Sequence, residues 1–244
     1  MNNTQRVFLA VYLPATIFIL MLDNMFTGAN IVQYVKYSTM ITLFLAARSV
    51  KKDGPEQQLM SMALLFVVIA DFFLVFLPTI TYSDFTAFGT AAFAAAYLCL
   101  IFATQKNFSL GRADIIMALM VGGISILAFL TMEMEEIQGA MLLGVIAFGV
   151  VLAYMTWTSI CTIFRKYYRL KVAGLLALAG ILMFISDLAV AYVHFNLAYT
   201  VFYQPWMQNI VWASYIPAWT LIALVISEDD PYRMPALKYF RTKI

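Results

Sequence analysis

The chain contains 244 residues, of which 64% are hydrophobic and 11% are charged, and its formal net charge is +2. A chain of this composition has too little polar surface for a soluble globular protein, and its mean hydropathy of +0.86 indicates an integral membrane protein. The small net charge, without a basic segment that contains interleaved aromatic residues, gives no reason to expect a nucleic-acid partner.

Eight apolar segments follow one another along the chain if about 20 apolar residues are taken for each membrane span. We expect transmembrane helices at residues 7–22, 31–47, 59–77, 85–103, 115–131, 139–164, 172–193 and 203–226. The connections are short and contain no linker rich in Pro, Gly or Ser. Residues 1–244 are therefore expected to form a single domain, an all-α bundle of eight transmembrane helices.

The basic residues lie at every second connection. Of the 15 Lys and Arg residues, 14 fall at the N-terminus, in the even-numbered connections or at the C-terminus. The odd-numbered connections contain none and carry acidic residues such as Asp23 and Asp84 instead. By the positive-inside rule, both termini are expected on the cytoplasmic side of the membrane.

Three ionisable residues lie inside the apolar segments: Lys36, Asp71 and Asp187. A charged side chain near the bilayer centre costs about 3 kcal/mol on insertion scales, so each of them is a candidate site residue. At 1.5 Å per residue, all three are expected roughly 8 to 10 Å below the outer interface, and Gln208 falls in the same layer. We expect these side chains to converge.

Two carboxyl groups and an ammonium group in one apolar layer favour one protonated and one ionised carboxyl near neutral pH, which suits general acid catalysis. An alternative is purely structural: Lys36 and Asp71 form an ion pair that fixes the helices, and hydroxyl groups such as that of Ser186 hold Asp187. His194 is the only histidine, which excludes sites built on several histidines, whereas an all-carboxylate site would favour a hard ion such as magnesium. We expect no metal and no cofactor. Tyr97 is expected deeper than this layer, as core or cavity lining.

Five short motifs, in five of the eight segments, carry a resemblance to a known family. They comprise residues 36–40 (Lys-Tyr-Ser-Thr-Met), residues 71–74 (Asp-Phe-Phe-Leu), Gly89 with Phe93, residues 180–187 ending in Ser-Asp, and residues 208–214. Together they resemble the YhhN-type lysoplasmalogenase family, which is described as having eight spans, and the resemblance covers the whole chain in order.

The sequence departs from the family pattern at four places. Tyr37 follows Lys36 where the family usually has proline, Ala70 precedes Asp71 where it usually has glycine, and Tyr97 stands where a histidine is common. The spacing from residue 184 to residue 187 is one residue short. These departures indicate a divergent member.

The resemblance implies hydrolysis of the vinyl ether bond of a lysoplasmalogen to a fatty aldehyde and a glycerophospho-head group. It makes Asp71 and Asp187 the catalytic pair, with Lys36 orienting a carboxylate or contacting the substrate phosphate and Gln208 holding water or a glycerol oxygen. The other residues expected at the substrate are Thr39, Gly89, Phe93 and Ser186. The expected partners are a lysophospholipid substrate and membrane lipids, and the expected location is a bacterial inner membrane, as a multi-pass protein.

Another function class uses the same three charged residues. A small-solute or proton-coupled transporter would bind its substrate at the Lys36, Asp71 and Asp187 layer, but it also needs a polar path inward. The expected cytoplasmic halves of the spans carry few polar residues, which favours the enzyme. A retinal-type photoreceptor with Lys36 as its Schiff-base lysine is disfavoured, because such proteins place that lysine in the last helix and the last span here has none.

Overall fold

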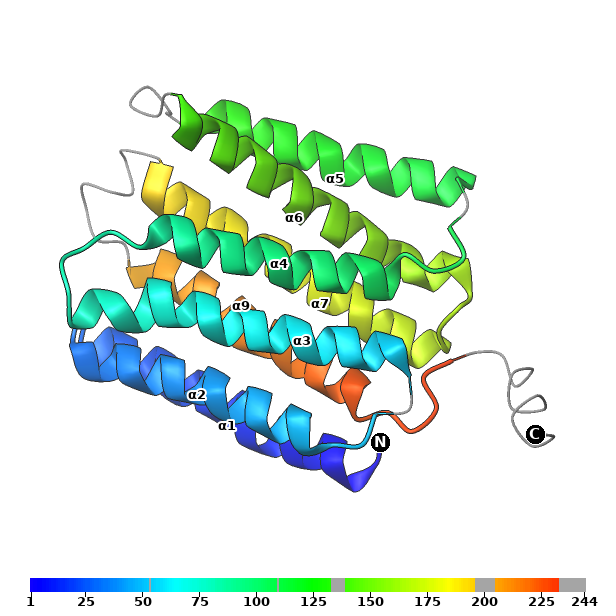
Figure 1. Cartoon of the computed structure of the whole chain (residues 1–244), viewed down its shortest axis with the longest axis horizontal. Coiled ribbons are helices and arrows are strands. Elements are labelled where there is room, and N and C mark those ends of the chain that lie inside the picture. The colour runs from blue at the N-terminus through cyan, green and yellow to red at the C-terminus, as the bar shows by residue number, and fades with distance from the viewer. Residues whose placement is uncertain (53, 109, 133–138, 196–204, 233–244) are drawn as a thin grey trace.

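The computed structural model describes residues 1–52, 54–108, 110–132, 139–195 and 205–232, and all the regular secondary structure in these ranges is helical (Figure 1). The long helices are α1 (Asn3–Met25), α2 (Asn30–Ser49), α3 (Pro55–Asp71), α4 (Thr86–Thr104), α5 (Arg112–Thr131), α6 (Ala140–Arg165), α7 (Leu170–Phe195) and α9 (Pro205–Ile226). A π-helical turn, η1 (Phe72–Phe76), and a 3-10 turn, η2 (Leu77–Thr79), continue α3.

The all-α, multi-pass architecture expected from the sequence is confirmed. Each predicted span coincides with one of the long helices, and seven helical segments in the described ranges are long and apolar enough to cross a membrane. The long helix outside this set is α2. Its 20 residues are sufficient in length, but Lys36 and several amide and hydroxyl side chains lower its hydropathy.

The helices pack in pairs across the bundle, as Figure 1 shows. At the top of that view α5 packs on α6, which also contacts α4 and α7. Below them α3 contacts α4, and α7 contacts α9. Helices α1 and α2 lie at the bottom of the view. Helix α9 touches α1, α2, α3 and α7 and is the most buried of the candidate spans, whereas α5 is the least buried. The central helix is therefore the one that can bring residues from several others together.

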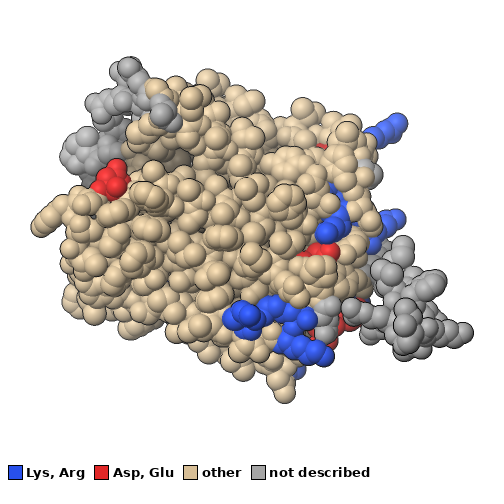
Figure 2. All heavy atoms as spheres, viewed as in Figure 1, with Lys and Arg blue, Asp and Glu red and all other residues tan. Residues whose placement is uncertain are grey.

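The exposed basic residues gather at one end of the bundle. In the face shown in Figure 2, the Lys and Arg side chains lie toward the right-hand end, on the side where Figure 1 marks the N-terminus, and a broad uncharged surface separates them from the opposite end, where an acidic side chain lies. Large apolar side chains such as Val11, Phe18, Leu119 and Leu130 are exposed on the flanks of α1 and α5. Such a surface suits contact with lipid.

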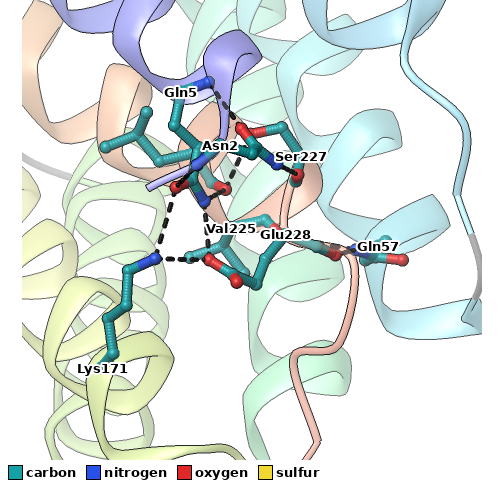
Figure 3. Close-up of polar contacts among 8 residues, drawn as sticks. Asn2, Gln5, Gln57, Lys171, Val225, Ser227 and Glu228 are labelled. Atoms are coloured by element: carbon teal, nitrogen blue, oxygen red, sulfur yellow. Dashed lines mark hydrogen bonds and ion pairs between the residues drawn. The ribbon is translucent and has the colours of Figure 1, made fainter.

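Amide side chains cap the last turn of α9 at the end where the N-terminus lies (Figure 3). The last carbonyl groups of a helix lack partners within the helix. Here Gln5 Nε2 donates to the Leu224 carbonyl (3.2 Å) and Asn2 Nδ2 donates to the Ser227 carbonyl (2.7 Å). The buried Gln57 amide donates to the Ile226 carbonyl (3.0 Å). These bonds tie α1 and α3 to the central helix.

Candidate functional site

Asp71 is the last residue of α3 and stands directly before the π-helical turn η1. Its side chain is 2% exposed. Oδ1 accepts a hydrogen bond of 2.8 Å from the Tyr215 hydroxyl of α9, while Oδ2 is buried and has no hydrogen-bond partner among the described residues. Single π turns within helices occur frequently at functional sites, where they redirect side chains.

Asp187 is held in a similar way by another tyrosine. It lies on α7, it is partly exposed, and its Oδ2 accepts a hydrogen bond of 2.6 Å from the Tyr97 hydroxyl of α4. The neighbouring Ser186 hydroxyl, expected in the structural alternative to hold Asp187, donates instead to the Val211 carbonyl of α9 (3.3 Å). Ser186 thus contributes to the packing of α7 on α9.

A cluster of four aromatic residues joins the two carboxyl–tyrosine pairs, and we call it the aromatic bridge: Phe93, Tyr97, Tyr215 and Trp219. The ring of Phe93 lies 6.1 Å from Tyr97 and 6.0 Å from Tyr215, and the ring of Trp219 lies 6.4 Å and 6.5 Å from the same two tyrosines. Electrostatic interactions cross between the pairs, since Asp71 interacts with Tyr97 and Asp187 with Tyr215. The two carboxyl groups therefore share one site between α3, α4, α7 and α9.

Lys36 lies beside this site in a pair of its own. Its Nζ is 3.0 Å from Asp23 Oδ1 and 4.6 Å from the centre of the Trp212 ring, and Trp212 in turn contacts Tyr215 at 5.4 Å. The expected placement of Asp23 in the first connection was wrong: α1 continues to Met25, and Asp23 is a buried residue of its last turn. The alternative ion pair between Lys36 and Asp71 is likewise wrong, because Lys36 pairs with Asp23.

The residues expected at the substrate divide into two groups. Phe93 belongs to the aromatic bridge, and Gln208 lies half-buried one helical turn before Trp212. Gly89 instead allows close packing, because a Cβ atom there would lie 2.4 Å from Leu74 Cγ of η1. Thr39 donates to the Val35 carbonyl of its own helix (2.8 Å) and lines an open groove on the surface of α2.

Sequence reasoning missed the roles of Tyr97 and Tyr215. Tyr97 was expected deeper than the charged layer, and Tyr215 received no role. A helical spacing could have indicated both: Tyr97 follows Phe93 by four residues, and Tyr215 follows Gln208 by seven, so each lies on the same helix face as a residue of the resemblance.

Within the described ranges, no group of three or more His, Cys, Asp or Glu side chains could hold a metal ion. The chemical groups that the site offers are therefore two carboxyls, two phenols and, beside them, an ammonium group paired with a third carboxylate. Such a set can transfer protons and stabilise a developing positive charge.

Comparison with known proteins identifies the family. The profile of the YhhN family matches residues 31–226, from the first turn of α2 to the end of α9. This range includes the helices that supply Lys36, Asp71 and Asp187 and leaves out α1 with Asp23. No curated protein and no solved structure gives a significant match. The resemblance found in the motifs is thus confirmed, and the chain belongs to the YhhN family.

Proposed function

We propose that the protein is a membrane-embedded hydrolase that cleaves the vinyl ether bond of lysoplasmalogen-type lysophospholipids into a fatty aldehyde and a glycerophospho-head group. One observation carries this proposal: two carboxyl groups on different helices, each bonded to a tyrosine hydroxyl, meet at one aromatic bridge. Membership of the YhhN family is consistent with a hydrolase.

The chemistry of a vinyl ether explains why two carboxyl groups are needed. Cleavage begins when an acid protonates the alkene carbon remote from oxygen, which leaves a positively charged oxocarbenium ion. A nearby carboxylate stabilises that charge and removes a proton from the water that attacks it. Glycosidases divide the same two tasks, acid and carboxylate, between a pair of acidic residues. The Phe93 ring and the other apolar side chains of the bridge would exclude bulk water around the reacting bond.

We also propose the membrane arrangement. All eight long helices span the membrane, α2 included, because a 20-residue helix is long enough and its polar residues accompany the buried Lys36. Both termini are cytoplasmic in this proposal, since the basic residues gather at the end of the bundle that carries the N-terminus and the last turn of α9 (Figure 2). The site then lies toward the outer face, as Lys36 is six residues from the first residue of α2, Asn30. A bacterial inner membrane is the proposed location.

The transporter alternative is disfavoured by the contacts at the end of the bundle where the N-terminus lies. A transporter needs a second opening there, but the amides of Gln5 and Gln57 bind the last carbonyls of α9 and the Lys171 ammonium bonds Glu228 at 2.8 Å (Figure 3). Opening a path along α9 would break these contacts. A hydrolase needs access from one side only.

The proposal is tested by aldehyde release from a lysoplasmalogen by the purified protein in lipid nanodiscs. We expect turnover by the native protein and none with the saturated alkyl-ether analogue, which has no double bond to protonate. Asp71→Asn and Asp187→Asn should each lower turnover about 1,000-fold, the scale of general acid–base catalysis. Asp84→Asn, at an exposed residue of the connection before α4, is the matched control and should leave turnover unchanged. Absence of aldehyde from the folded native protein would overturn the proposal.

A further inference from the structure

We propose that Asp71 is the protonated acid of the site and Asp187 its ionised carboxylate, with Tyr215 and Tyr97 as the residues that position them. The catalytic part of this assignment rests on the proposed function. The assignment of the proton itself does not, because it follows from the surroundings of the two carboxyl groups.

The first argument is burial. An ionised Asp71 would have a buried oxygen without any partner, since Oδ2 has none among the described residues and the side chain is 2% exposed. An uncompensated buried charge costs several kcal/mol, whereas a neutral buried hydroxyl without a partner costs about 1 to 3 kcal/mol. The neutral form of Asp71 is therefore the less costly one, with the proton on Oδ2 and the carbonyl oxygen Oδ1 accepting from Tyr215.

The second argument is hydrogen-bond geometry. The Tyr97 hydroxyl lies 2.6 Å from Asp187 Oδ2, within the range of about 2.5 to 2.7 Å for a hydroxyl bonded to a charged carboxylate. The Tyr215 hydroxyl lies 2.8 Å from Asp71 Oδ1, a distance usual for neutral partners, about 2.7 to 2.8 Å. Among the described residues, neither Asp187 oxygen is both buried and without a hydrogen-bond partner, unlike Asp71 Oδ2.

The third argument concerns the other charged and titratable groups around the site. Within the described part of the chain neither carboxyl forms an ion pair, and Lys36 of α2 is already paired with Asp23. The groups that interact with Asp71 are phenols: Tyr37 of α2, Tyr97 of α4 and Tyr215 of α9. No cation of the described ranges pairs with either carboxyl, and two ionised aspartates at one bridge would repel each other, so one of the two is neutral.

The assignment gives a balanced reaction. The Asp71 Oδ2 proton moves to the alkene carbon remote from the ether oxygen, and the alkene electron pair forms the new C–H bond. Water adds to the oxocarbenium carbon while Asp187 takes its proton, which yields a hemiacetal. Asp187 then returns that proton to the leaving glycerol oxygen as the C–O bond breaks, and Asp71 takes the hemiacetal hydroxyl proton as the aldehyde forms. Both carboxyls end in their starting states.

The test is infrared spectroscopy of the substrate-free protein in lipid at neutral pH, compared in H₂O and D₂O. A protonated carboxyl has a carbonyl stretch at higher frequency than any carboxylate, and the band moves down in D₂O. We expect the native protein to show this band, Asp71→Asn to lose it and Asp187→Asn to retain it. The assignment would be overturned if Asp187→Asn lost the band, whether alone or together with Asp71→Asn. It would also be overturned if both variants retained the band.

Two further variants keep the test decisive if Asp71→Asn fails to fold. Tyr215→Phe should shift the carboxyl band to higher frequency, because the Asp71 carbonyl loses the hydrogen bond at Oδ1. Tyr97→Phe should leave that frequency unchanged, because its hydroxyl bonds the other carboxyl. The reverse pattern would contradict the assignment. The infrared measurement uses no substrate, so it tests the proton assignment independently of aldehyde release. If the expected band pattern is seen but the protein releases no aldehyde, the proton assignment stands and the proposed hydrolase function is refuted.

Discussion

The ammonium group of Lys36 lies 3.0 Å from Asp23 Oδ1, so this buried lysine is neutralised by the last turn of α1 and by neither carboxyl of the aromatic bridge. Lys36 is 1% exposed and Asp23 4% exposed, and the Trp212 ring covers the ammonium group at 4.6 Å. The bridge carboxyls thus have tyrosine hydroxyls as their hydrogen-bond partners.

The Lys36–Asp23 pair leads to a stability prediction. Removing one partner of a buried ion pair leaves an uncompensated charge and costs about 3 to 5 kcal/mol. Lys36→Met and Asp23→Asn should each lower the midpoint of thermal unfolding in detergent, and the double variant should recover much of the loss. Equal midpoints for the native protein and both single variants would show that the pair contributes little.

A second prediction concerns Tyr97, whose hydroxyl bonds Asp187. Tyr97→Phe removes a hydrogen bond to a charged carboxylate, worth about 1.5 to 3 kcal/mol, and should lower turnover about 10- to 100-fold. Tyr97→His restores a donor and should recover part of this loss. Aldehyde release measures both variants. Equal turnover in the Phe variant and the native protein would remove Tyr97 from the site.

A third prediction separates packing from substrate binding at Gly89. A Cβ atom at this position would lie 2.4 Å from Leu74 Cγ, and overpacking of this kind costs about 1 to 3 kcal/mol. Gly89→Ala should therefore lower the unfolding midpoint, and Leu74→Ala should partly restore it. Gly122→Ala on α5 is the matched control, since no atom outside its own helix lies within 4 Å of the position. A full-stability Gly89→Ala variant with weakened substrate affinity would favour the substrate-binding role instead.

A fourth prediction concerns pH and the end of α9. Burial raises the pKa of Glu228, but hydrogen bonds from Lys171 and Gln5 outweigh it and hold the pKa below its ordinary value of 4.5. A lowered folded-state pKa stabilises the fold above the unfolded-state pKa, and this stabilisation is lost as the pH falls through the folded value. Glu228→Gln should therefore lower the unfolding midpoint at pH 7, and the difference from the native protein should diminish below about pH 4. A difference that stays constant down to pH 3 would contradict this role.

The sequence predicted the long helices well, because apolar runs of this length have few other solutions in a membrane. It also singled out Asp71 and Asp187 as candidate site residues, since an isolated carboxyl within such a run is costly, and their catalytic role stays a prediction. The pairing of Lys36 could not be predicted in the same way. The apolar run of the first span ends before Asp23, but the helix continues to Met25 and turns that carboxylate inward.

The tyrosines of the site were missed for a different reason. Tyr97 and Tyr215 carry no charge and have the apolar bulk usual in a helix core, so their sequence context gives little sign of a bonded hydroxyl. Their hydrogen-bond partners lie on helices distant in the sequence: Asp187 of α7 for Tyr97 of α4, and Asp71 of α3 for Tyr215 of α9. Each tyrosine meets its partner only when the bundle has folded. The π turn after Asp71 likewise has no marker in the sequence beyond its run of apolar residues.

The central claim, that a carboxyl group of this site protonates a vinyl ether at carbon, is tested most directly by turnover in D₂O with immediate trapping of the aldehyde as a hydrazone. The account predicts one deuterium on the carbon next to the aldehyde carbon in every product molecule, with product formation by Asp71→Asn slowed about 1,000-fold. Aldehyde without deuterium at that carbon would contradict it.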